Sequence, residues 1–259
     1  ATEIAQPALF VAGYATYEVL AAEGVAAKFV AGHSLGEYTA GAAAGVLTFA
    51  DGLKAVKARG EAMRDAAARR PGGMTAVIGA KAEELAAWVA DAAGRGVAVV
   101  ANQNSAEQVI VSGETPALEA LEERCKAAGV RAVRLNVSGA FHSPLMQPAA
   151  ETMAEVLAGL KFAEPRCALV GNVAGIVLTS ARMVRDELAS QLISAVRWEA
   201  CVRTLAGNGV RLAVEAGPGR VLAGLIRRID RTIKTFATGT PAELDEALTG
   251  AREAVRGPA

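Results

Sequence analysis

Short apolar runs alternate with longer helical stretches along the chain. The apolar run of residues 28–31 ends in Gly32 and helical composition resumes at Glu37, which predicts a strand, a sharp turn and a helix. Two more helices are predicted around this unit. The helix of residues 5–23 is interrupted early by a proline, and the helix of residues 51–69 is ended by a Pro-Gly-Gly sequence.

The pattern changes after residue 72. Strand-like and helical segments follow in the order βαββαβ, at residues 74–80, 81–93, 97–102, 108–112, 115–129 and 130–137. Thr115 is expected to cap the second helix, with Pro116 at its first position. This order is that of a ferredoxin-like split unit. We therefore expect residues 73–137 to form a small subdomain inserted into a larger α/β domain of residues 1–72 and 138–259.

Strands and helices alternate again after residue 137. Helices are predicted at residues 147–160, 181–193 and 198–207, after Gly219 and at the C-terminus, and strands at residues 168–173, 210–215 and 233–237. Strands that alternate with helices imply a mostly parallel sheet covered on both faces. The predicted fold class is therefore α/β.

Composition narrows the classes of protein. Hydrophobic residues make up 52% of the 259 residues, which excludes intrinsic disorder. The 27 basic residues equal the 27 acidic ones, so net charge does not indicate a nucleic acid or an anionic membrane as partner. No apolar run approaches the roughly 20 residues of a membrane helix, and no signal-peptide pattern is visible. The 3 cysteines lack metal-site spacing and are odd in number, which predicts a cytoplasmic protein without a metal.

Gly32-His33-Ser34-Leu35-Gly36 fits the G-x-S-x-G nucleophile elbow. In that motif a strained turn between a strand and a helix exposes a serine hydroxyl. The apolar run before it and the helix after it support this interpretation. The backbone N–H of Leu35, at the start of the helix, is placed to donate to a developing oxyanion. The alternative is an ordinary glycine-rich loop.

A serine nucleophile needs a base, and the sequence holds 2 histidines. His33 adjoins Ser34, so its side chain is expected to point away as a buried structural residue. His142 remains as the imidazole candidate, the alternative being a solvent-exposed loop residue. No acidic partner for it stands out, which makes a conventional esterase less attractive. Arg59 is able to hold a substrate carboxylate through two parallel hydrogen bonds, and a solvated surface arginine is its alternative.

Several motifs occur together in a familiar order. They are Gln6-Pro7-Ala8-Leu9, Gly32-His33-Ser34-Leu35-Gly36-Glu37-Tyr38, Ala58-Arg59-Gly60, Asn102-Gln103-Asn104-Ser105, Val111-Ser112-Gly113, Phe141-His142-Ser143-Pro144-Leu145-Met146 and Glu215-Ala216-Gly217-Pro218-Gly219. With these motifs the chain resembles the malonyl-CoA:acyl carrier protein transacylases and their polyketide-synthase acyltransferase relatives. The resemblance extends over nearly all of the sequence and implies a hydrolase-like core that carries a ferredoxin-like insertion.

The resemblance also implies the roles of particular residues. Ser34 matches the family's nucleophile, His142 its histidine base and Arg59 its carboxylate-binding arginine. The family orients its histidine through backbone carbonyls, one of which matches that of Gln191, and this would explain the missing triad acid. Two further residues, Asn102 and Asn104, match positions that line the cleft between the subdomains.

The implied reaction is ping-pong transfer of a malonyl group in fatty acid biosynthesis. The group passes from malonyl-CoA to a seryl ester and then to the phosphopantetheine thiol of acyl carrier protein. No bound cofactor is implied, because CoA belongs to the substrate and phosphopantetheine to the partner. The loop Gly139-Ala140-Phe141-His142 resembles the malonyl-type form of the family rather than the methylmalonyl-type Tyr-Ala-Ser-His, which favours malonyl.

The sequence departs from the family at its start. Family members begin with a strand and a Gly-Gln-Gly-Ser-Gln loop that supplies an oxyanion-hole N–H, and this motif is absent here. Losing such a donor costs about 100- to 1,000-fold in rate, and losing a strand exposes a sheet edge. Either the sequence is part of a longer chain or another polypeptide completes the site.

Three alternative functions stay open from the sequence. The first is a discrete trans-acting acyltransferase of a polyketide synthase. The second is a catalytically weak module that binds CoA or carrier protein, which the absent glutamine loop favours. The third is a carboxylesterase, which would hydrolyse simple esters without any dependence on Arg59.

Overall fold

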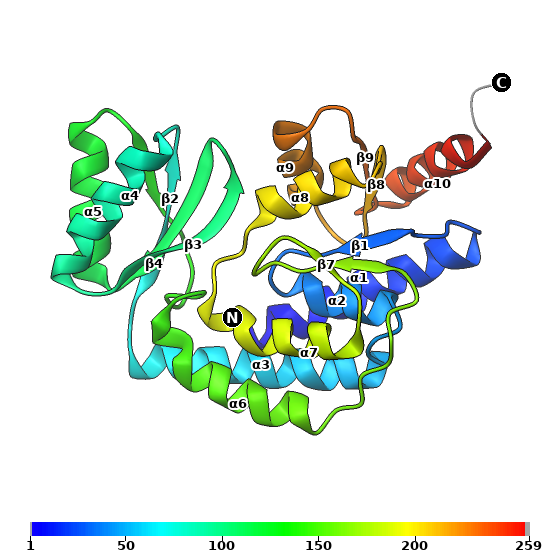
Figure 1. Ribbon diagram of the computed structural model, residues 1–259, viewed down its shortest axis with the longest axis horizontal. Helices are drawn as coiled ribbons and strands as arrows, with labels where there is room; N and C mark the ends of the chain where they lie inside the picture. Colours follow the sequence, from blue (N-terminus) through cyan, green and yellow to red (C-terminus); the bar gives the residue numbers. More distant parts are fainter. Residues whose placement is uncertain (1, 257–259) are drawn as a thin grey trace.

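The computed structural model describes residues 2–256 (Figure 1). In chain order the helices and strands are α1 (Thr2–Ala22), β1 (Phe29–Ala31), α2 (Gly36–Ala43), α3 (Phe49–Arg69), β2 (Gly73–Ile78), α4 (Ala82–Ala92), β3 (Ala98–Ser105), β4 (Gln108–Gly113), α5 (Thr115–Ala127), β5 (Arg131–Arg134), α6 (Gln147–Ala158), β6 (Ala168–Val170), β7 (Val177–Leu178), α7 (Ala181–Ser190), α8 (Trp198–Gly207), β8 (Leu212–Glu215), α9 (Val221–Ile229), β9 (Lys234–Ala237) and α10 (Pro241–Arg256). Short 3₁₀ turns occur at Ala93–Arg95, Pro144–Met146 and Gln191–Ile193. No helix among the described residues is long and apolar enough to cross a membrane.

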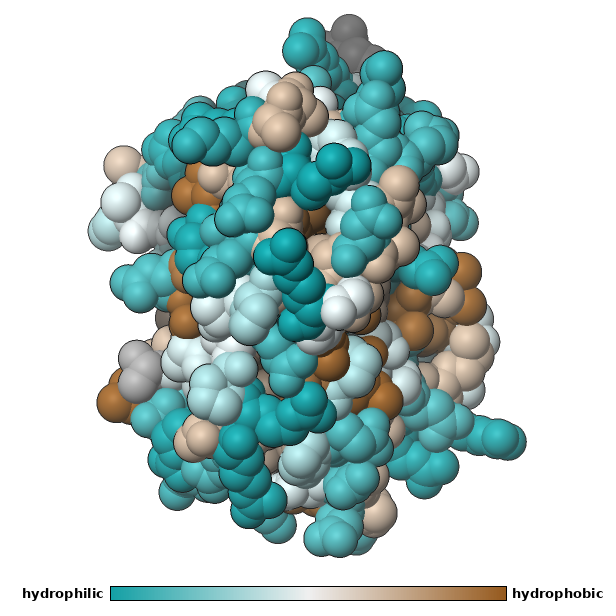
Figure 2. Space-filling view, turned by 90° about the vertical axis from the view of Figure 1, so that its left-hand side faces the viewer, coloured by the Kyte–Doolittle hydropathy of each residue, from teal (hydrophilic) through white to brown (hydrophobic). Residues whose placement is uncertain are grey.

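The segment from β2 to β5 forms a four-stranded antiparallel sheet. Its strand order is β3-β4-β2-β5, and its elements follow the predicted βαββαβ order. Helices α4 and α5 cover one face of this sheet (Figure 1). A hydrophobic cluster that includes Val77, Val111, Leu118 and Leu121 lies between the helices and the sheet. Viewed from the side of these helices, the surface is mostly hydrophilic (Figure 2). The helices therefore separate an apolar core from water.

The strands outside this segment form two separate sheets. Strand β1 pairs in parallel with β6, which pairs antiparallel with β7, whereas β8 and β9 form a parallel pair of their own. This corrects the expectation of one mostly parallel sheet. Within residues 2–256 no backbone ladder joins β1 to β8. Side chains of both strands, such as Phe29 and Ala213, instead pack in one hydrophobic cluster.

Several predicted boundaries shift. Pro7 lies inside α1 without ending it, and Glu114, not Thr115, is the N-cap of α5. The helix predicted at residues 181–193 becomes 3₁₀ from Gln191 onward. The strand predicted at residues 168–173 ends at Val170. The backbone N–H of the second residue beyond it donates to a side chain of α2 instead of continuing the ladder.

Close helix packing brings the start of the chain to the middle of α3. A Cβ on Gly60 would lie 2.7 Å from the Cα of Glu3, so only glycine permits this approach of α1. Helix α3 packs against both α1 and α6.

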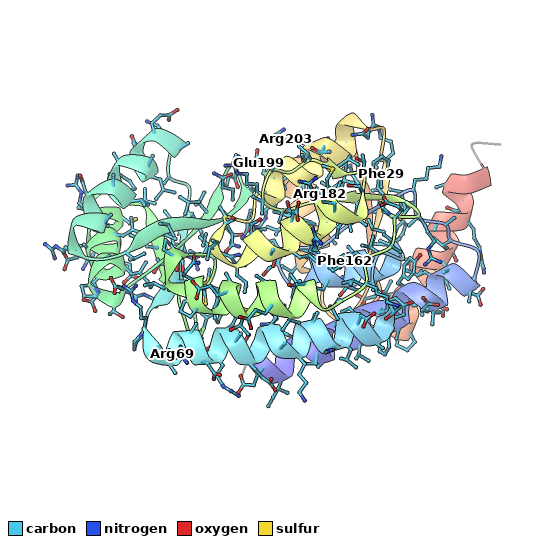
Figure 3. All side chains as sticks on the ribbon, turned by 60° about the horizontal axis from the view of Figure 1, so that its bottom comes forward. Phe29, Arg69, Phe162, Arg182, Glu199 and Arg203 are labelled. Carbon is cyan, nitrogen blue, oxygen red and sulfur yellow. The ribbon has the colours of Figure 1, made fainter. Side chains whose placement is uncertain are left out.

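Solvated helix faces carry charged pairs, such as Glu199 and Arg203 on α8 (Figure 3), where the arginine Nε lies 3.0 Å from a carboxylate oxygen.

Candidate active site

Ser34 stands on a strained turn between β1 and α2. Its φ of 54° is a left-handed conformation that few non-glycine residues adopt. A Cβ on Gly32 would come within 2.0 Å of the Gly36 backbone, so the turn requires glycine at position 32. At Gly36 a Cβ would meet nothing within 4 Å, so the second glycine of the motif is not required by sterics.

A buried asparagine that the sequence did not indicate fixes this turn. Asn172 Oδ1 accepts a hydrogen bond from the Ser34 backbone N–H at 2.7 Å, and its Nδ2 donates to the Gly32 carbonyl at 2.7 Å. The side chain therefore joins both ends of the strained turn to the segment after β6. Since such strain persists only where surrounding contacts hold it, Asn172 stabilises the strained conformation of Ser34.

Replacing Asn172 by alanine is expected to lower the free energy of unfolding by about 2–4 kcal/mol, because two buried hydrogen bonds are lost. Urea denaturation measures this change. The matched control is Asn208→Ala, which removes an exposed asparagine with one side-chain hydrogen bond and should cost much less. Equal losses for the two variants would show that Asn172 does not hold the turn.

His142 faces the serine hydroxyl. Its Nε2 lies 2.7 Å from Ser34 Oγ, and its Nδ1 lies 3.0 Å from the Gln191 carbonyl and 3.2 Å from the Ser194 carbonyl. Carbonyl oxygens only accept, so Nδ1 carries the proton and Nε2 keeps its lone pair. This arrangement explains how the imidazole is oriented without an acidic residue. The side chain is buried, which rules out a solvent-exposed bystander.

The surroundings of His142 favour its neutral form. Burial first, and then the charge of Arg59, lower the pKa of His142 from 6.5 to about 3, against a smaller opposing effect of the two carbonyls. The imidazole is therefore ready to accept a proton throughout the neutral and mildly acidic range.

This depressed pKa gives a testable pH dependence. Because kcat/KM reports the free enzyme, its value for acylation should stay level from pH 7.5 to pH 5, with no fall centred on the ordinary histidine pKa. Rapid-quench measurement of serine acylation checks this, with circular dichroism at each pH to confirm that the protein is folded. A titration with a midpoint near 6.5 would contradict the geometry.

Arg59 lies fully inside the protein, not on its surface. Its Nη2 donates to Ser34 Oγ at 3.0 Å and to Gln191 Oε1 at 2.8 Å, and its Nη1 donates to Gln6 Oε1 at 2.7 Å. The guanidinium also lies over the Tyr38 ring, 5.6 Å from its centroid. Within the described residues no carboxylate forms an ion pair with it and its Nε has no partner. A buried cation with only neutral partners is costly, so the site favours an anion beside the serine.

One backbone donor at the elbow is free. The N–H groups of Ser34, Gly36, Glu37 and Tyr38 all donate to protein oxygens. That of Leu35, the N-cap of α2, makes no hydrogen bond within residues 2–256. It stands at the positive end of a helix next to the nucleophile, as an oxyanion donor requires.

The two predicted cleft asparagines lie on β3, at the edge that meets the larger part of the molecule. Asn104 Oδ1 accepts from His33 Nε2 at 2.8 Å, so Asn104 stabilises the turn through the residue before Ser34. His33 is partly buried against Trp198, with its pKa lowered by burial, as expected of a structural histidine. Asn102 is buried and bridges to Val196, which ties β3 to the segment that carries the Ser194 carbonyl.

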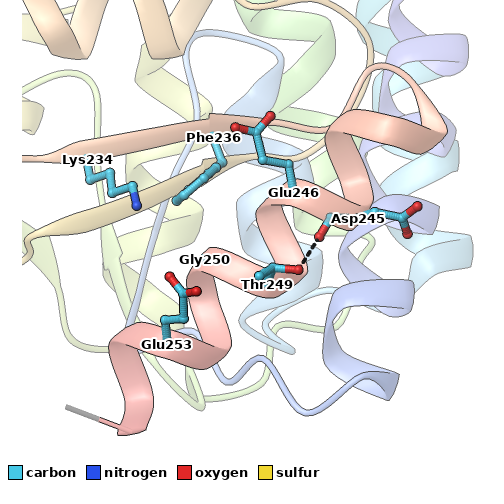
Figure 4. Close-up of a pocket in the computed structure, with 7 residues that line it drawn as sticks. All are labelled: Lys234, Phe236, Asp245, Glu246, Thr249, Gly250 and Glu253. Atoms are coloured by element: carbon cyan, nitrogen blue, oxygen red, sulfur yellow. Dashed lines mark hydrogen bonds between the residues drawn. The ribbon is translucent and has the colours of Figure 1, made fainter. Parts of the chain in front are cut away.

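Other features carry no comparable chemistry. Among the described residues no group of three potential ligands is arranged to hold a metal ion. A hollow of about 420 Å³ lies between β9 and α10 (Figure 4), and Ser34 is not among the residues that line it. Its lining includes three carboxylates, of Asp245, Glu246 and Glu253, and one lysine, which does not suit an anionic substrate.

The chain matches the family model described as "Acyl transferase domain" over residues 1–244. It is 38% identical to the malonyl CoA-acyl carrier protein transacylase of Bacillus subtilis, over 96% of this chain and 79% of that protein. It is 41% identical to the protein of the same name from Salmonella typhimurium, over 94% of this chain and 80% of that protein.

Solved structures agree with these relatives. The malonyl-CoA:acyl carrier protein transacylase of Xanthomonas oryzae is similar with a TM-score of 0.93 and 41% identity, over 96% of this chain and 80% of that one. A malonyl-transacylase in complex with a type II polyketide synthase acyl-carrier protein is similar with a TM-score of 0.91 and 38% identity, over 96% and 81%.

Proposed function

Because the chain belongs to the acyl transferase domain family, we propose that it moves a malonyl group from malonyl-CoA to the phosphopantetheine thiol of acyl carrier protein. The observation that carries the proposal is the buried, charge-unpaired Arg59 within hydrogen-bond distance of a serine that faces a neutral histidine. A simple esterase has no use for such a cation. A malonyl thioester, with a carboxylate beyond its reacting carbonyl, matches it.

The first half-reaction acylates Ser34. His142 Nε2 takes the hydroxyl proton while the oxygen attacks the thioester carbonyl carbon. The negative charge that develops on the carbonyl oxygen is stabilised by the Leu35 N–H. The intermediate collapses with cleavage of the C–S bond, and the CoA thiolate leaves with the proton from His142. The product is a malonyl-serine ester.

The second half-reaction reverses these roles. His142 takes the proton of the phosphopantetheine thiol, and the sulfur attacks the ester carbonyl. The Ser34 oxygen leaves and recovers the proton, so the enzyme returns to its starting state. Arg59 holds the carboxylate throughout. Once Ser34 Oγ is an ester oxygen it is a weaker acceptor, which frees an Nη2 hydrogen for the substrate.

The proposal extends to the architecture. Residues 73–137 are assigned as a ferredoxin-like subdomain, supported by their element order and antiparallel strand order. Residues 1–72 and 138–259 are assigned as a hydrolase-like subdomain, supported by the β1–Ser34–α2 turn; residue 1 and residues 257–259 lie outside the described residues. Asn102 and Asn104 would line the boundary on the substrate side. No bound cofactor enters the mechanism, and three free cysteines support a cytoplasmic location.

A polyketide pathway is the second candidate for the same chemistry. It is favoured by the similarity to the malonyl-transacylase that was solved with a type II polyketide synthase carrier protein. The two pathways differ in the carrier protein and not in the acyl-transfer step. Relative rates with carrier proteins of the two types would separate them.

Transfer to a carrier protein tests the proposal. The protein is incubated with malonyl-CoA and a carrier protein that bears phosphopantetheine, and the intact mass of the carrier is followed. We expect the carrier to gain one malonyl group, and the same carrier without phosphopantetheine to gain none. Failure to load the phosphopantetheine-bearing carrier would refute the proposed transferase function.

A further inference from the structure

The side chain of Gln191 separates the cation of the site from a buried carboxyl group. Its Nε2 donates to the Ser34 carbonyl at 3.0 Å and to a carboxyl oxygen of Glu37, while its Oε1 accepts from Arg59 Nη2 at 2.8 Å. Gln191 and Glu37 are 1% and 0% exposed. Water cannot replace any of these three contacts, so each must be made inside the protein.

The orientation of this amide is determined by its neighbours. The Ser34 carbonyl only accepts and the Arg59 guanidinium only donates, so the nitrogen of Gln191 must face Ser34 and its oxygen must face Arg59. Glu37 adds a second acceptor on the nitrogen side and is itself held by the Asn172 backbone N–H at 3.1 Å. The carboxyl group thus stabilises the one amide orientation that presents an acceptor to the arginine.

The interposed amide keeps the charge of Arg59 available. A carboxylate in direct contact would neutralise the guanidinium and compete with a substrate carboxylate for its hydrogens. Glu37 instead reaches Arg59 only through a neutral group. Burial, and then the nearby Glu187, raise the pKa of Glu37 well above its usual value, which further reduces its competition for the cation.

We propose that Glu37 and the side chain of Gln191 are positioning residues for malonyl specificity, a role that rests on the proposed function. They hold Arg59 beside Ser34 in the orientation that binds the substrate carboxylate, and they leave its charge unneutralised. This role is separate from that of the Gln191 backbone carbonyl, which orients His142 and is retained in any substitution at position 191.

The test compares two isosteric variants by the ratio of kcat/KM for malonyl-CoA to kcat/KM for acetyl-CoA. Gln191→Glu puts a carboxylate on Arg59, and the ratio should fall about 100-fold, mainly through a higher KM for malonyl-CoA. Glu37→Gln supplies an amide that can donate to Gln191 as well as accept from it, which weakens one of the three contacts that hold the Gln191 amide in its orientation. Here the ratio should fall about 10-fold.

Glu122→Gln is the matched control. It removes a half-buried carboxyl group on α5, which accepts from Thr75 Oγ1 at 2.6 Å and from Arg134 Nε at 2.7 Å and makes no hydrogen bond to Glu37, Gln191 or Arg59 in the described structure. Its ratio should equal that of the wild type. A ratio that is also unchanged in Gln191→Glu, or equal losses for both thioesters, would overturn the inference. Failure of the proposed function is distinguishable, because the wild type itself would then form no malonyl-serine ester.

Discussion

Replacing Ser34 by alanine is expected to abolish the malonyl-enzyme intermediate and to lower malonyl transfer by about 10⁴-fold or more. The Ser34 hydroxyl is the nucleophile of the first half-reaction and the leaving group of the second. Its oxygen accepts from Arg59 and lies 2.7 Å from His142 Nε2. No other nucleophile occupies this position. Rapid-quench measurement of carrier-protein loading gives the rate.

Ser105→Ala is the control for this substitution. It removes a buried serine on β3, whose hydroxyl accepts only a nearby backbone N–H and makes no hydrogen bond to Ser34, His142 or Arg59 in the described structure. Its transfer rate should stay close to that of the wild type. Residual transfer by Ser34→Ala above about one part in a hundred would mean that the reaction does not pass through a seryl ester.

Replacing Arg59 by methionine is expected to lower kcat/KM for malonyl-CoA by about 30- to 1,000-fold, the cost of losing one member of a buried charge pair. Methionine keeps most of the length and apolar stem of arginine but has no hydrogens to donate and no charge. The value for acetyl-CoA should fall much less, since acetyl has no carboxylate. Steady-state kinetics with the two thioesters measure both effects.

Arg59→Lys refines this prediction. Lysine keeps the positive charge but lacks the planar fork, so the loss for malonyl-CoA should lie between those of the wild type and the methionine variant. Equal losses for malonyl-CoA and acetyl-CoA in both variants would mean that Arg59 supports the fold of the site and does not read the carboxylate.

The local part of the site could be predicted from the sequence. The G-x-S-x-G pattern is contiguous, and its turn, with Ser34 at positive φ and Leu35 at the helix start, follows from short-range sterics. His142 could be named because only two histidines are present and His33 is on the wrong side of the turn. Their mutual geometry could not be derived, because it depends on contacts between distant segments.

The supporting residues could not be predicted for the same reason. Asn172 is 138 residues from Ser34 and the Gln191 side chain is 157 residues from it, and neither stands out by residue type or spacing. Gln6 and Glu37 lie inside motifs that the family resemblance matched, which was a usable signal. Periodicity did not indicate that Arg59 is buried, since alanines occupy most faces of α3.

The sheets show a further limit of sequence patterns. Strand β7 has 2 residues, which is too short for a periodic signal, so it was not predicted. Alternating strands and helices predicted parallel pairing, which holds for β1 with β6 and for β8 with β9. Which strands become neighbours is a tertiary property, and it is here that the expectation of one sheet was wrong.

Peptide mass spectrometry after brief incubation with malonyl-CoA tests the central claim most directly. We predict a malonyl group on the peptide that contains Ser34, none in the Ser34→Ala variant, and much weaker labelling by acetyl-CoA. This pattern would establish the covalent intermediate and its selectivity for a carboxylate together. An unlabelled Ser34 peptide in the wild-type protein, or equal labelling by the two thioesters, would contradict the account.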